Sequence, residues 1–316
     1  MPTRQGSIRI FRLFGIDVYL HWSWILIAVF RFQFFHYQEY GSPIWFVIEY
    51  LGLFGIVLMH EFGHALACRQ VGGQANQIVL WPLGGVAYVA PPQRPGAMLW
   101  SIAAGPLVNV ALVPVLSVFW FCSHLLGWPE TFPDANLFLQ TMWEINLLLL
   151  IFNMLPVFPL DGGQILRSLL WFFVGRANSL LISSVIGFVG VAGAAVFIVS
   201  VFLSGAKGSA LWLGALDLFV AMNCWRALQQ ALALSRLEKA PRRTEFSCPV
   251  CRESPPAGEF WGCGRCRKAF DTFLTQGFCP ACNAEYSVTA CPFCHNIRPL
   301  AEWRSFTAPP VPSRPS

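Results

Sequence analysis

Residues 60–64 read His-Glu-Phe-Gly-His and lie within an apolar stretch that runs from residue 44 to residue 68. On a helix, positions i and i+4 share one face, so the imidazoles of His60 and His64 can bind one zinc ion. Glu61 lies about 100° further round the helix axis, beside the position that the metal leaves open. Charged and metal-binding side chains are costly within a membrane helix, so a function is the expected reason for them.

A third ligand has to come from another segment, because hydrolytic zinc sites use three protein ligands and a water molecule. The best candidate is Asp161, within the sequence NMLPVFPLDGG at residues 153–163. Pro156 and Pro159 each remove a backbone donor, so we expect the preceding helix to end just before the carboxylate. Non-helical backbone at membrane depth is tolerated only when it is buried in protein or lines a wet cavity, and a hydrolase needs such a cavity.

The composition is that of an integral membrane protein. Only 12% of the 316 residues are charged and the mean hydropathy is +0.54, whereas soluble domains have roughly 25% charged residues. Apolar windows of about 20 residues, the length that crosses a bilayer, predict six membrane crossings, of which the first is the shortest: residues 20–35, 44–68, 97–122, 138–157, 180–203 and 209–228.

The basic residues predict the orientation of these crossings. If the N-terminus is cytoplasmic, seven arginines fall inside (Arg4, Arg9, Arg12, Arg69, Arg94, Arg167, Arg176) and two cations fall outside (Arg31, Lys207). This asymmetry satisfies the positive-inside rule. It places His60, His64 and Asp161 near the inner leaflet. We therefore expect a multi-pass protein of the cell membrane with both termini in the cytoplasm.

Further motifs accompany the two described above: FRLFGI at residues 11–16, HWS at 21–23, PLGGVA at 82–87 and AGPLVN at 104–109. Together these segments resemble the site-2 protease family of intramembrane zinc metalloproteases, in its compact bacterial and archaeal branch. The resemblance covers about residues 8–226.

The resemblance implies that His60, His64 and Asp161 ligate a catalytic zinc ion and that Glu61 is the general base. Asn153, which matches the asparagine of the same family motif, would help to hold the substrate or the oxyanion. The implied substrate is a transmembrane or membrane-adjacent segment of another protein.

A hairpin is predicted between the second and third crossings. Residues 78–89 are β-branched and aromatic, but Pro82, Gly84 and Gly85 interrupt them, which indicates a short hairpin or a re-entrant strand. A helical substrate must unwind before water can attack its peptide bonds. Our hypothesis is that the hairpin offers an edge to which the unwound substrate adds as a strand.

The composition changes after Leu237, where the apolar runs stop. Eight of the eleven cysteines then form four Cys-x-x-Cys pairs: Cys248/Cys251, Cys263/Cys266, Cys279/Cys282 and Cys291/Cys294. Two pairs complete a tetrahedral four-cysteine site, so two structural zinc ions are predicted. Disulfides are the competing interpretation, but they are rare in the cytoplasm. We expect a membrane domain at residues 1–237, a double zinc ribbon at 238–306 and a disordered tail at 307–316.

The sequence leaves open which cysteine pairs share a metal ion. Sequential pairing joins the first pair to the second and the third to the fourth. Nested pairing joins the second to the third and the first to the fourth, and residues 261–282 resemble a zinc ribbon that would favour it. Interleaved pairing and a replacement of Cys294 by His295 are further alternatives.

The charge of the C-terminal segment argues against a nucleic-acid partner. Residues 240–316 hold nine basic and six acidic side chains, a formal charge of +3, and two four-thiolate zinc centres would change this to about −1. Phosphate binding needs a basic surface, so a cytoplasmic protein partner is the better expectation. The alternative function for the whole chain is a catalytically silent membrane scaffold that recruits such a partner through its ribbons.

Overall fold

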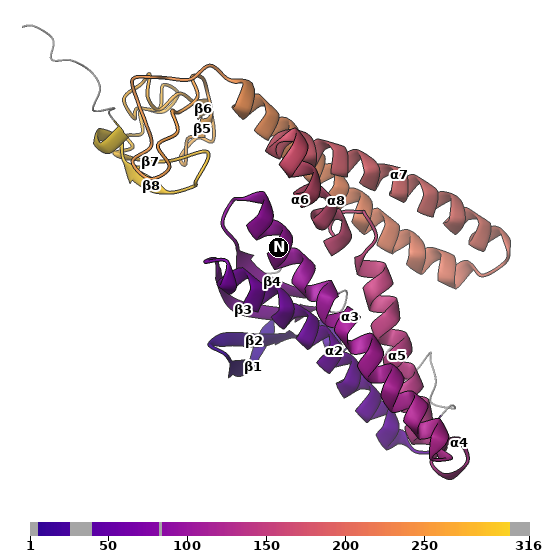
Figure 1. Cartoon of the computed structure of the whole chain (residues 1–316). Coiled ribbons are helices and arrows are strands. Elements are labelled where there is room, and N and C mark those ends of the chain that lie inside the picture. The colour runs from indigo at the N-terminus through magenta and orange to yellow at the C-terminus, as the bar shows by residue number, and fades with distance from the viewer. Residues whose placement is uncertain (1–5, 26–39, 82–83, 304–316) are drawn as a thin grey trace, which may run out of the picture. The chain divides into compact units, whose positions relative to one another are not determined.

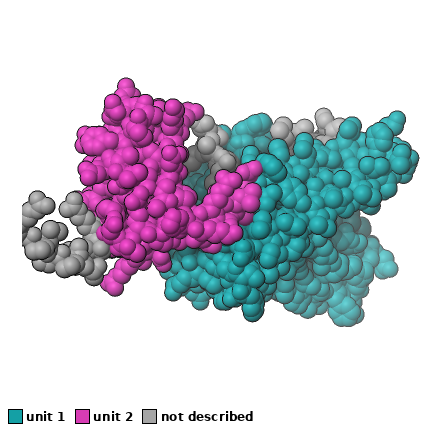
Figure 2. Space-filling view, turned by 90° about the horizontal axis from the view of Figure 1, so that it is seen from above, with its two compact units in different colours: residues 1–228 teal, residues 229–316 magenta. Residues whose placement is uncertain are grey.

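The computed structural model describes residues 6–25, 40–81 and 84–303 (Figure 1). By its internal contacts the chain divides into two compact units, residues 1–228 and residues 229–316 (Figure 2). The predicted first crossing at residues 20–35 falls largely outside the described residues, as do Pro82, Leu83 and the tail at residues 307–316.

A four-stranded sheet opens unit 1. Strands β1 (Ser7–Leu13), β2 (Ile16–His21), β3 (Gln74–Trp81) and β4 (Gly84–Ala90) lie in the order β1-β2-β3-β4. Strands β2 and β3 are parallel, and the two outer pairs are antiparallel. The predicted hairpin is therefore β3–β4, but the hairpin β1–β2 was not predicted. Leu20 and His21, predicted to begin the first crossing, end strand β2 instead.

Five helices of the described residues are long and apolar enough to cross a membrane: α2 (Pro43–Gln70), α3 (Pro95–Leu125), α5 (Pro133–Asn153), α7 (Arg176–Leu203) and α8 (Lys207–Lys239). They correspond to the second to sixth predicted crossings, which confirms a mostly helical, multi-pass membrane fold. Pro43, Pro95 and Pro133 stand in the first turns of their helices, where a missing N–H breaks no intrahelical hydrogen bond.

Helices α2, α3 and α5 pack side by side, and the sheet packs against α2 (Figure 1). Small residues permit the close approach of α2 and α3. A Cβ at Gly63 would lie 2.6 Å from the carbonyl oxygen of Ala104, so the two backbones meet there without an intervening side chain. The described residues of this unit also form two shorter helices, α4 (Trp128–Thr131) and α6 (Asp161–Val174).

The chain turns back on itself between α5 and α6. Helix α5 ends at Asn153, before Pro156, as the two prolines predict. The first turn of α6 then packs on this connection: a Cβ at Gly162 would overlap the carbonyl oxygen of Met154, and one at Gly163 would lie 2.7 Å from the carbonyl carbon of Val157. Two consecutive glycines thus allow the tight return that sets the position of Asp161, the first residue of α6.

Unit 2 holds two small two-stranded sheets, β5 (Trp261–Gly262) with β6 (Ala269–Phe270), and β7 (Val288–Ala290) with β8 (Ile297–Pro299), followed by the short helix η1 (Leu300–Trp303). Its apolar core is small. Phe273 and the fully buried Trp303 pack beside Cys248 and Cys291. Such a core stabilises a domain of this size only weakly, so cross-links or metal ions are expected to contribute.

Candidate metal centres

Helix α2 places His60 and His64 on one face, and both side chains are buried. Their Nε2 atoms lie 3.1 Å apart. Asp161, at the start of α6, brings its Oδ2 atom to 3.1 Å from Nε2 of His60 and 3.4 Å from Nε2 of His64. The structure therefore brings together the three residues that the sequence suggested as ligands of one ion.

The hydrogen bonds of the two rings show which of their atoms remain available to a cation. Nδ1 of His60 faces the amide oxygen of Asn109 at 2.5 Å, and Nδ1 of His64 faces the carbonyl oxygen of Ser101 at 3.0 Å. Both partners are acceptors, so each neutral ring carries its hydrogen on Nδ1. The Nε2 lone pairs of both rings then point at each other and at the carboxylate of Asp161. Three acceptors that converge on one point could hold a metal ion.

The separations also fit zinc. Bonds of about 2.0 to 2.1 Å to nitrogen and oxygen put neighbouring ligand atoms of a tetrahedral ion about 3.3 to 3.4 Å apart. The three ligand atoms lie 3.1 to 3.4 Å from one another. Two imidazoles and one carboxylate would leave a fourth position for a water molecule, which is the arrangement of hydrolytic rather than structural zinc sites.

Two asparagines from different helices support this site. Asn109 of α3 donates through Nδ2 to Oδ1 of Asn146 in α5 at 2.8 Å, and Nδ2 of Asn146 donates to the backbone oxygen of Asn109 at 3.0 Å. These two bonds fix the amide of Asn109 with its oxygen toward His60. Neither residue was predicted to support the site, although an amide within an apolar helix is a signal of a specific contact.

Gly105 of α3 lies directly against the two rings. A Cβ at this position would lie 2.8 Å from Nε2 of His60 and would overlap Nε2 of His64. Only glycine lets the α3 backbone pass this close to the ligand atoms. The role of Gly105 could not be read from the sequence, because its motif AGPLVN does not say what α3 packs against.

Glu61 and Asn153 complete the predicted set. Glu61 is buried in α2, directly after His60. Asn153 is the last residue of α5 and half-buried, and its side chain makes no hydrogen bond within the described part of the chain. The structure therefore does not tie Asn153 to the His60–His64–Asp161 cluster.

The eight cysteines of unit 2 form two clusters, and the pairing is nested. Cys248, Cys251, Cys291 and Cys294 form one cluster, and Cys263, Cys266, Cys279 and Cys282 form the other. Sulfur atoms from different Cys-x-x-Cys pairs lie 3.5 to 3.7 Å apart. A disulfide needs about 2.05 Å, whereas a tetrahedral zinc ion with bonds of about 2.3 Å needs about 3.8 Å. The separations therefore fit zinc ligands, and all eight cysteines are free.

All four Cys-x-x-Cys pairs have the same local structure. The residue after the second cysteine is left-handed in each: Arg252 (φ 61°), Arg267 (62°), Asn283 (58°) and His295 (58°). Its N–H donates to the carbonyl oxygen of the first cysteine at 2.9 Å in each pair. This turn directs the two thiol groups of a pair toward the same point. His295 serves as a residue of that turn and is not part of the ligand cluster.

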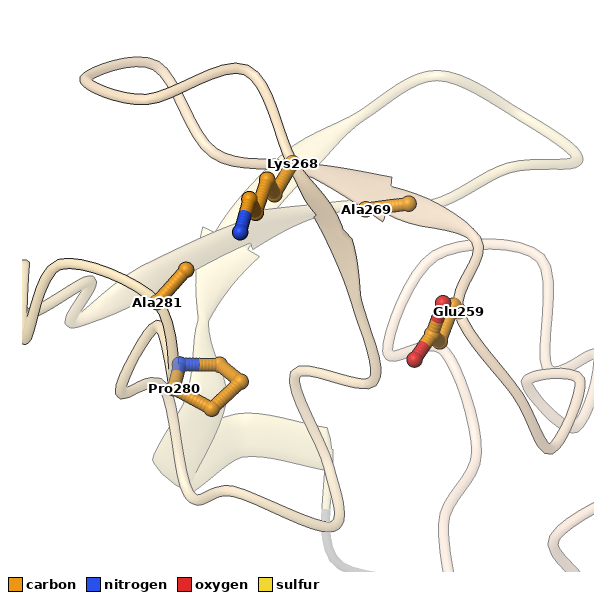
Figure 3. Close-up of a pocket in the computed structure, with 5 residues that line it drawn as sticks. All are labelled: Glu259, Lys268, Ala269, Pro280 and Ala281. Carbon is orange, nitrogen blue, oxygen red and sulfur yellow. The ribbon is translucent and has the colours of Figure 1, made fainter.

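An open hollow of about 460 Å³ on unit 2 is lined by Glu259, Lys268, Ala269, Pro280 and Ala281 (Figure 3). Its two charged side chains have opposite signs, so the hollow concentrates neither charge. This lining is consistent with the near-neutral charge of the segment and does not favour a phosphate backbone.

These features define a class, a multi-pass membrane protein with a hydrolase-type metal site within its helices. The model of Peptidase family M50 matches this chain at residues 48–137 and 132–199. The matched region includes His60, Glu61, His64 and Asp161. The resemblance to the site-2 proteases is thereby confirmed.

Similarity to two relatives covers about half of each of them. Zinc metalloprotease MJ0392 of Methanocaldococcus jannaschii is 33% identical over 183 residues, 57% of this chain and 50% of that protein. The protein sll0528 of Synechocystis sp. is 31% identical over 198 residues, 58% of this chain and 49% of its own length. The chain thus spans about half the length of these two relatives. Among solved structures, the site-2 protease from Methanocaldococcus jannaschii aligns with a TM-score of 0.48 and 28% identity, covering 70% of this chain and 95% of that chain.

Proposed function

We propose that this protein is an intramembrane zinc metalloendopeptidase that cleaves transmembrane or membrane-adjacent segments of other proteins. The observation that carries the proposal is the convergence of His60, His64 and Asp161, with ligand atoms 3.1 to 3.4 Å apart, next to the buried Glu61. The match to the model of Peptidase family M50 supports it.

Each residue of the centre has a separate task in this mechanism. His60, His64 and Asp161 hold a zinc ion, which when bound lowers the pKa of water toward about 7 and polarises a carbonyl oxygen. Glu61 accepts a proton from the attacking water and returns it to the amine of the departing strand. Asn153 holds the substrate backbone or its oxyanion. Asn109 and the carbonyl group of Ser101 keep the two imidazoles in the tautomer that can bind the metal.

The substrate must reach this centre in an extended form. Strand β4 is the last strand of the sheet, and its outer side has no strand neighbour among the described residues. In an antiparallel pair, alternate residues of β4 direct their N–H and C=O groups to β3 and outward. We propose that the unwound substrate adds to the outer edge as a fifth strand. The position of the sheet against α2, the helix of His60 and His64, supports this route.

The two cysteine clusters hold two structural zinc ions, so the protein binds three zinc ions in total. Both termini lie in the cytoplasm, as the distribution of arginines predicts. The ribbons bind a cytoplasmic protein rather than nucleic acid. The alternative function is a catalytically silent membrane scaffold, which would recruit a partner through the ribbons without cleaving a substrate.

The variant Glu61→Gln separates the two functions, because it removes the base and leaves all ligands in place. Wild-type and variant proteins should be expressed at equal levels, with equal zinc content, in cells that lack the endogenous protein. Fragments of membrane proteins are then compared by mass spectrometry of the membrane fraction. Fragments that appear only with the wild type support the protease and identify its substrates. Identical fragment patterns in both strains would favour the scaffold.

A further inference from the structure

A second hollow of unit 2, of about 350 Å³, is lined by residues of both small sheets, and we call it the aromatic hollow. Trp261 and Phe270 line it from β5 and β6, and Val288 lines it from β7. Phe260 and Tyr286 add two more aromatic rings. Among the described residues that line it there is no Lys, Arg, Asp or Glu. The aromatic hollow therefore favours an uncharged, apolar ligand.

Contacts between the two sheets hold this lining in place. Nε1 of Trp261 donates to the carbonyl oxygen of Ala290 at 3.1 Å, a bond that joins β5 to β7. The rings of Phe270 and Tyr286 pack with their centroids 5.9 Å apart. Phe260 and Val288 nevertheless remain 36% and 46% accessible. The aromatic hollow is therefore a formed surface that still exposes apolar side chains.

The chain itself contains a segment with matching chemistry. Residues 308–316 read APPVPSRPS and lie outside the described residues. Proline-rich sequences favour the polyproline II helix, which has three residues per turn and no internal hydrogen bonds. In that conformation Pro309, Pro312 and Pro315 share one face, and Pro310 does not lie on it. Grooves lined by aromatic side chains are the usual binding sites for such a face.

This segment begins a short distance from the aromatic hollow. Trp303, the last described residue, is fully buried, and its carbonyl oxygen accepts the N–H of Ser247 at 2.8 Å. The ring of Trp303 lies 5.1 Å from that of Phe273, which lies 5.2 Å from the ring of Trp261 in the lining. The six residues from Trp303 to Pro309 span about 19 Å at 3.1 Å per residue. The proline-rich segment is therefore long enough to reach the aromatic hollow.

We propose that residues 308–316 dock in the aromatic hollow of their own chain as a polyproline II segment, with Pro309, Pro312 and Pro315 against its rings. The tether to Trp303 holds the segment at an effective concentration in the millimolar range. A weak site is therefore filled by the tail before a free segment of another protein. Because the lining has no charged side chain, the docking does not depend on salt.

The test compares the intact chain with a shortened chain that ends at Thr307, both in a neutral detergent. A fluorescent peptide of residues 308–316 is titrated with each protein, and its anisotropy reports binding. The shortened chain should bind the peptide about tenfold more tightly than the intact chain, because the tethered tail no longer competes. Its affinity should be the same at low and high salt. Equal zinc content of the two proteins shows that both fold.

Two peptide variants form a matched pair. Pro312→Ala removes a proline from the proposed contact face and should weaken binding to the shortened chain by about fivefold, the loss expected from about 40 Å² of buried apolar surface. Pro310→Ala removes a proline from another face and should change the affinity by less than about twofold. Equal losses would mean that the shared face does not make the contact.

Two protein variants test the location of the contact in the shortened chain. Val288→Ser removes an apolar side chain from the aromatic hollow and should weaken peptide binding. Val250→Ser is the control, because Val250 has nearly the same exposure, 44%, and does not line the hollow. A loss of affinity in the Val250 variant alone would place the binding site elsewhere on the protein.

Three further outcomes would overturn the proposal. If the peptide does not bind the shortened chain, the aromatic hollow does not recognise this segment. If the peptide binds both chains equally tightly, the tail leaves the hollow open to a segment of another protein. If the difference between the two chains disappears when the protein is diluted, the bound tail belongs to a second copy of the chain.

Discussion

The Nδ1 atom of His60 lies 2.5 Å from the side-chain oxygen of Asn109, and Asn109 in turn is hydrogen-bonded to Asn146. This chain of contacts runs from α5 through α3 to His60, the first proposed ligand, on α2. It fixes the proton of His60 on Nδ1 and so leaves Nε2 free to bind a metal ion. The three helices therefore set the chemistry of the ligand as well as its position.

Replacing Asn109 by alanine should lower the zinc affinity of the membrane site by about 10- to 100-fold, the range found when the hydrogen-bond partner of a metal ligand is removed. The reason is that His60 loses the acceptor that holds its ring and its tautomer. Chelator competition on the full-length protein measures the affinity, and His64→Ala identifies which zinc equivalent belongs to this site. Asn109→Asp should bind zinc better than the alanine variant, because it keeps an acceptor for Nδ1.

Ser117→Ala is a matched control for Asn109→Ala. Ser117 also links α3 to α5, through a hydrogen bond of 2.9 Å from Nε1 of Trp143, but it does not contact a ligand. The Ser117→Ala variant should bind zinc at the membrane site with unchanged affinity. Equal zinc affinity in the Ser117 and Asn109 variants would mean that Asn109 only joins the helices.

Gly105→Ala should remove the zinc ion of the membrane site, because the new methyl group would overlap the ligand atoms of His60 and His64. Zinc analysis of the purified protein should show a loss of one equivalent, with the ribbon zinc ions retained. Gly55→Ala in α2 is the control, since a Cβ there meets nothing within 4 Å. Full zinc content in the Gly105 variant would show that α3 can shift without cost.

Much of the membrane site could be predicted from local sequence. The spacing of His60 and His64 fixes their shared face on any helix, and Pro156 and Pro159 fix where the chain leaves α5. Asp161 was inferred because a third ligand was required and a carboxylate followed that break. These inferences depend on helix geometry and ligand number, which do not require knowledge of the packing.

Other features depend on packing between distant segments. Gly105 and Asn109 matter only because α3 crosses α2 at His60 and His64, which the sequence of α3 does not specify. Strand β1 was missed because its alternation is irregular: Ile8 and Ile10 are exposed, and the register with β2 shifts between Arg9 and Phe11. The nested cysteine pairing was left open because all four Cys-x-x-Cys pairs form the same turn.

Proline substitutions in β4 should separate substrate binding from folding. Proline at each of positions 86–89 removes one backbone donor, and only alternate donors face outward. Proline at the outward-facing positions should reduce cleavage of a substrate identified with the Glu61→Gln comparison and leave thermal stability nearly unchanged. Proline at the other positions should break the hydrogen bonds to β3 and lower the thermal stability.

Ile10→Pro in β1, at the opposite edge of the sheet, is the control and should not reduce cleavage. Full activity in all four β4 variants would exclude edge binding.

Tyr286 should control the pH at which a metal ion leaves the cluster of Cys263, Cys266, Cys279 and Cys282. Its hydroxyl accepts the N–H of Gly264 at 2.7 Å and contacts Sγ of Cys263 at 3.1 Å. The N–H of Cys266 and this hydroxyl lower the pKa of Cys263 to about 5. A lowered pKa keeps the thiolate, and therefore the zinc bond, until the pH falls through that lower value.

In Tyr286→Phe the pKa of Cys263 should rise, so zinc should leave the Cys263–Cys282 cluster at a higher pH than in the wild type. The expected shift is on the order of one pH unit, the size of one hydrogen bond to a charged group. Cobalt-substituted protein reports the release through its thiolate absorption. The cluster of Cys248 and Cys291 is the internal control, because Tyr286 does not contact it, and its release should keep the wild-type midpoint. A common shift of both clusters would instead mean that the phenol stabilises unit 2 as a whole.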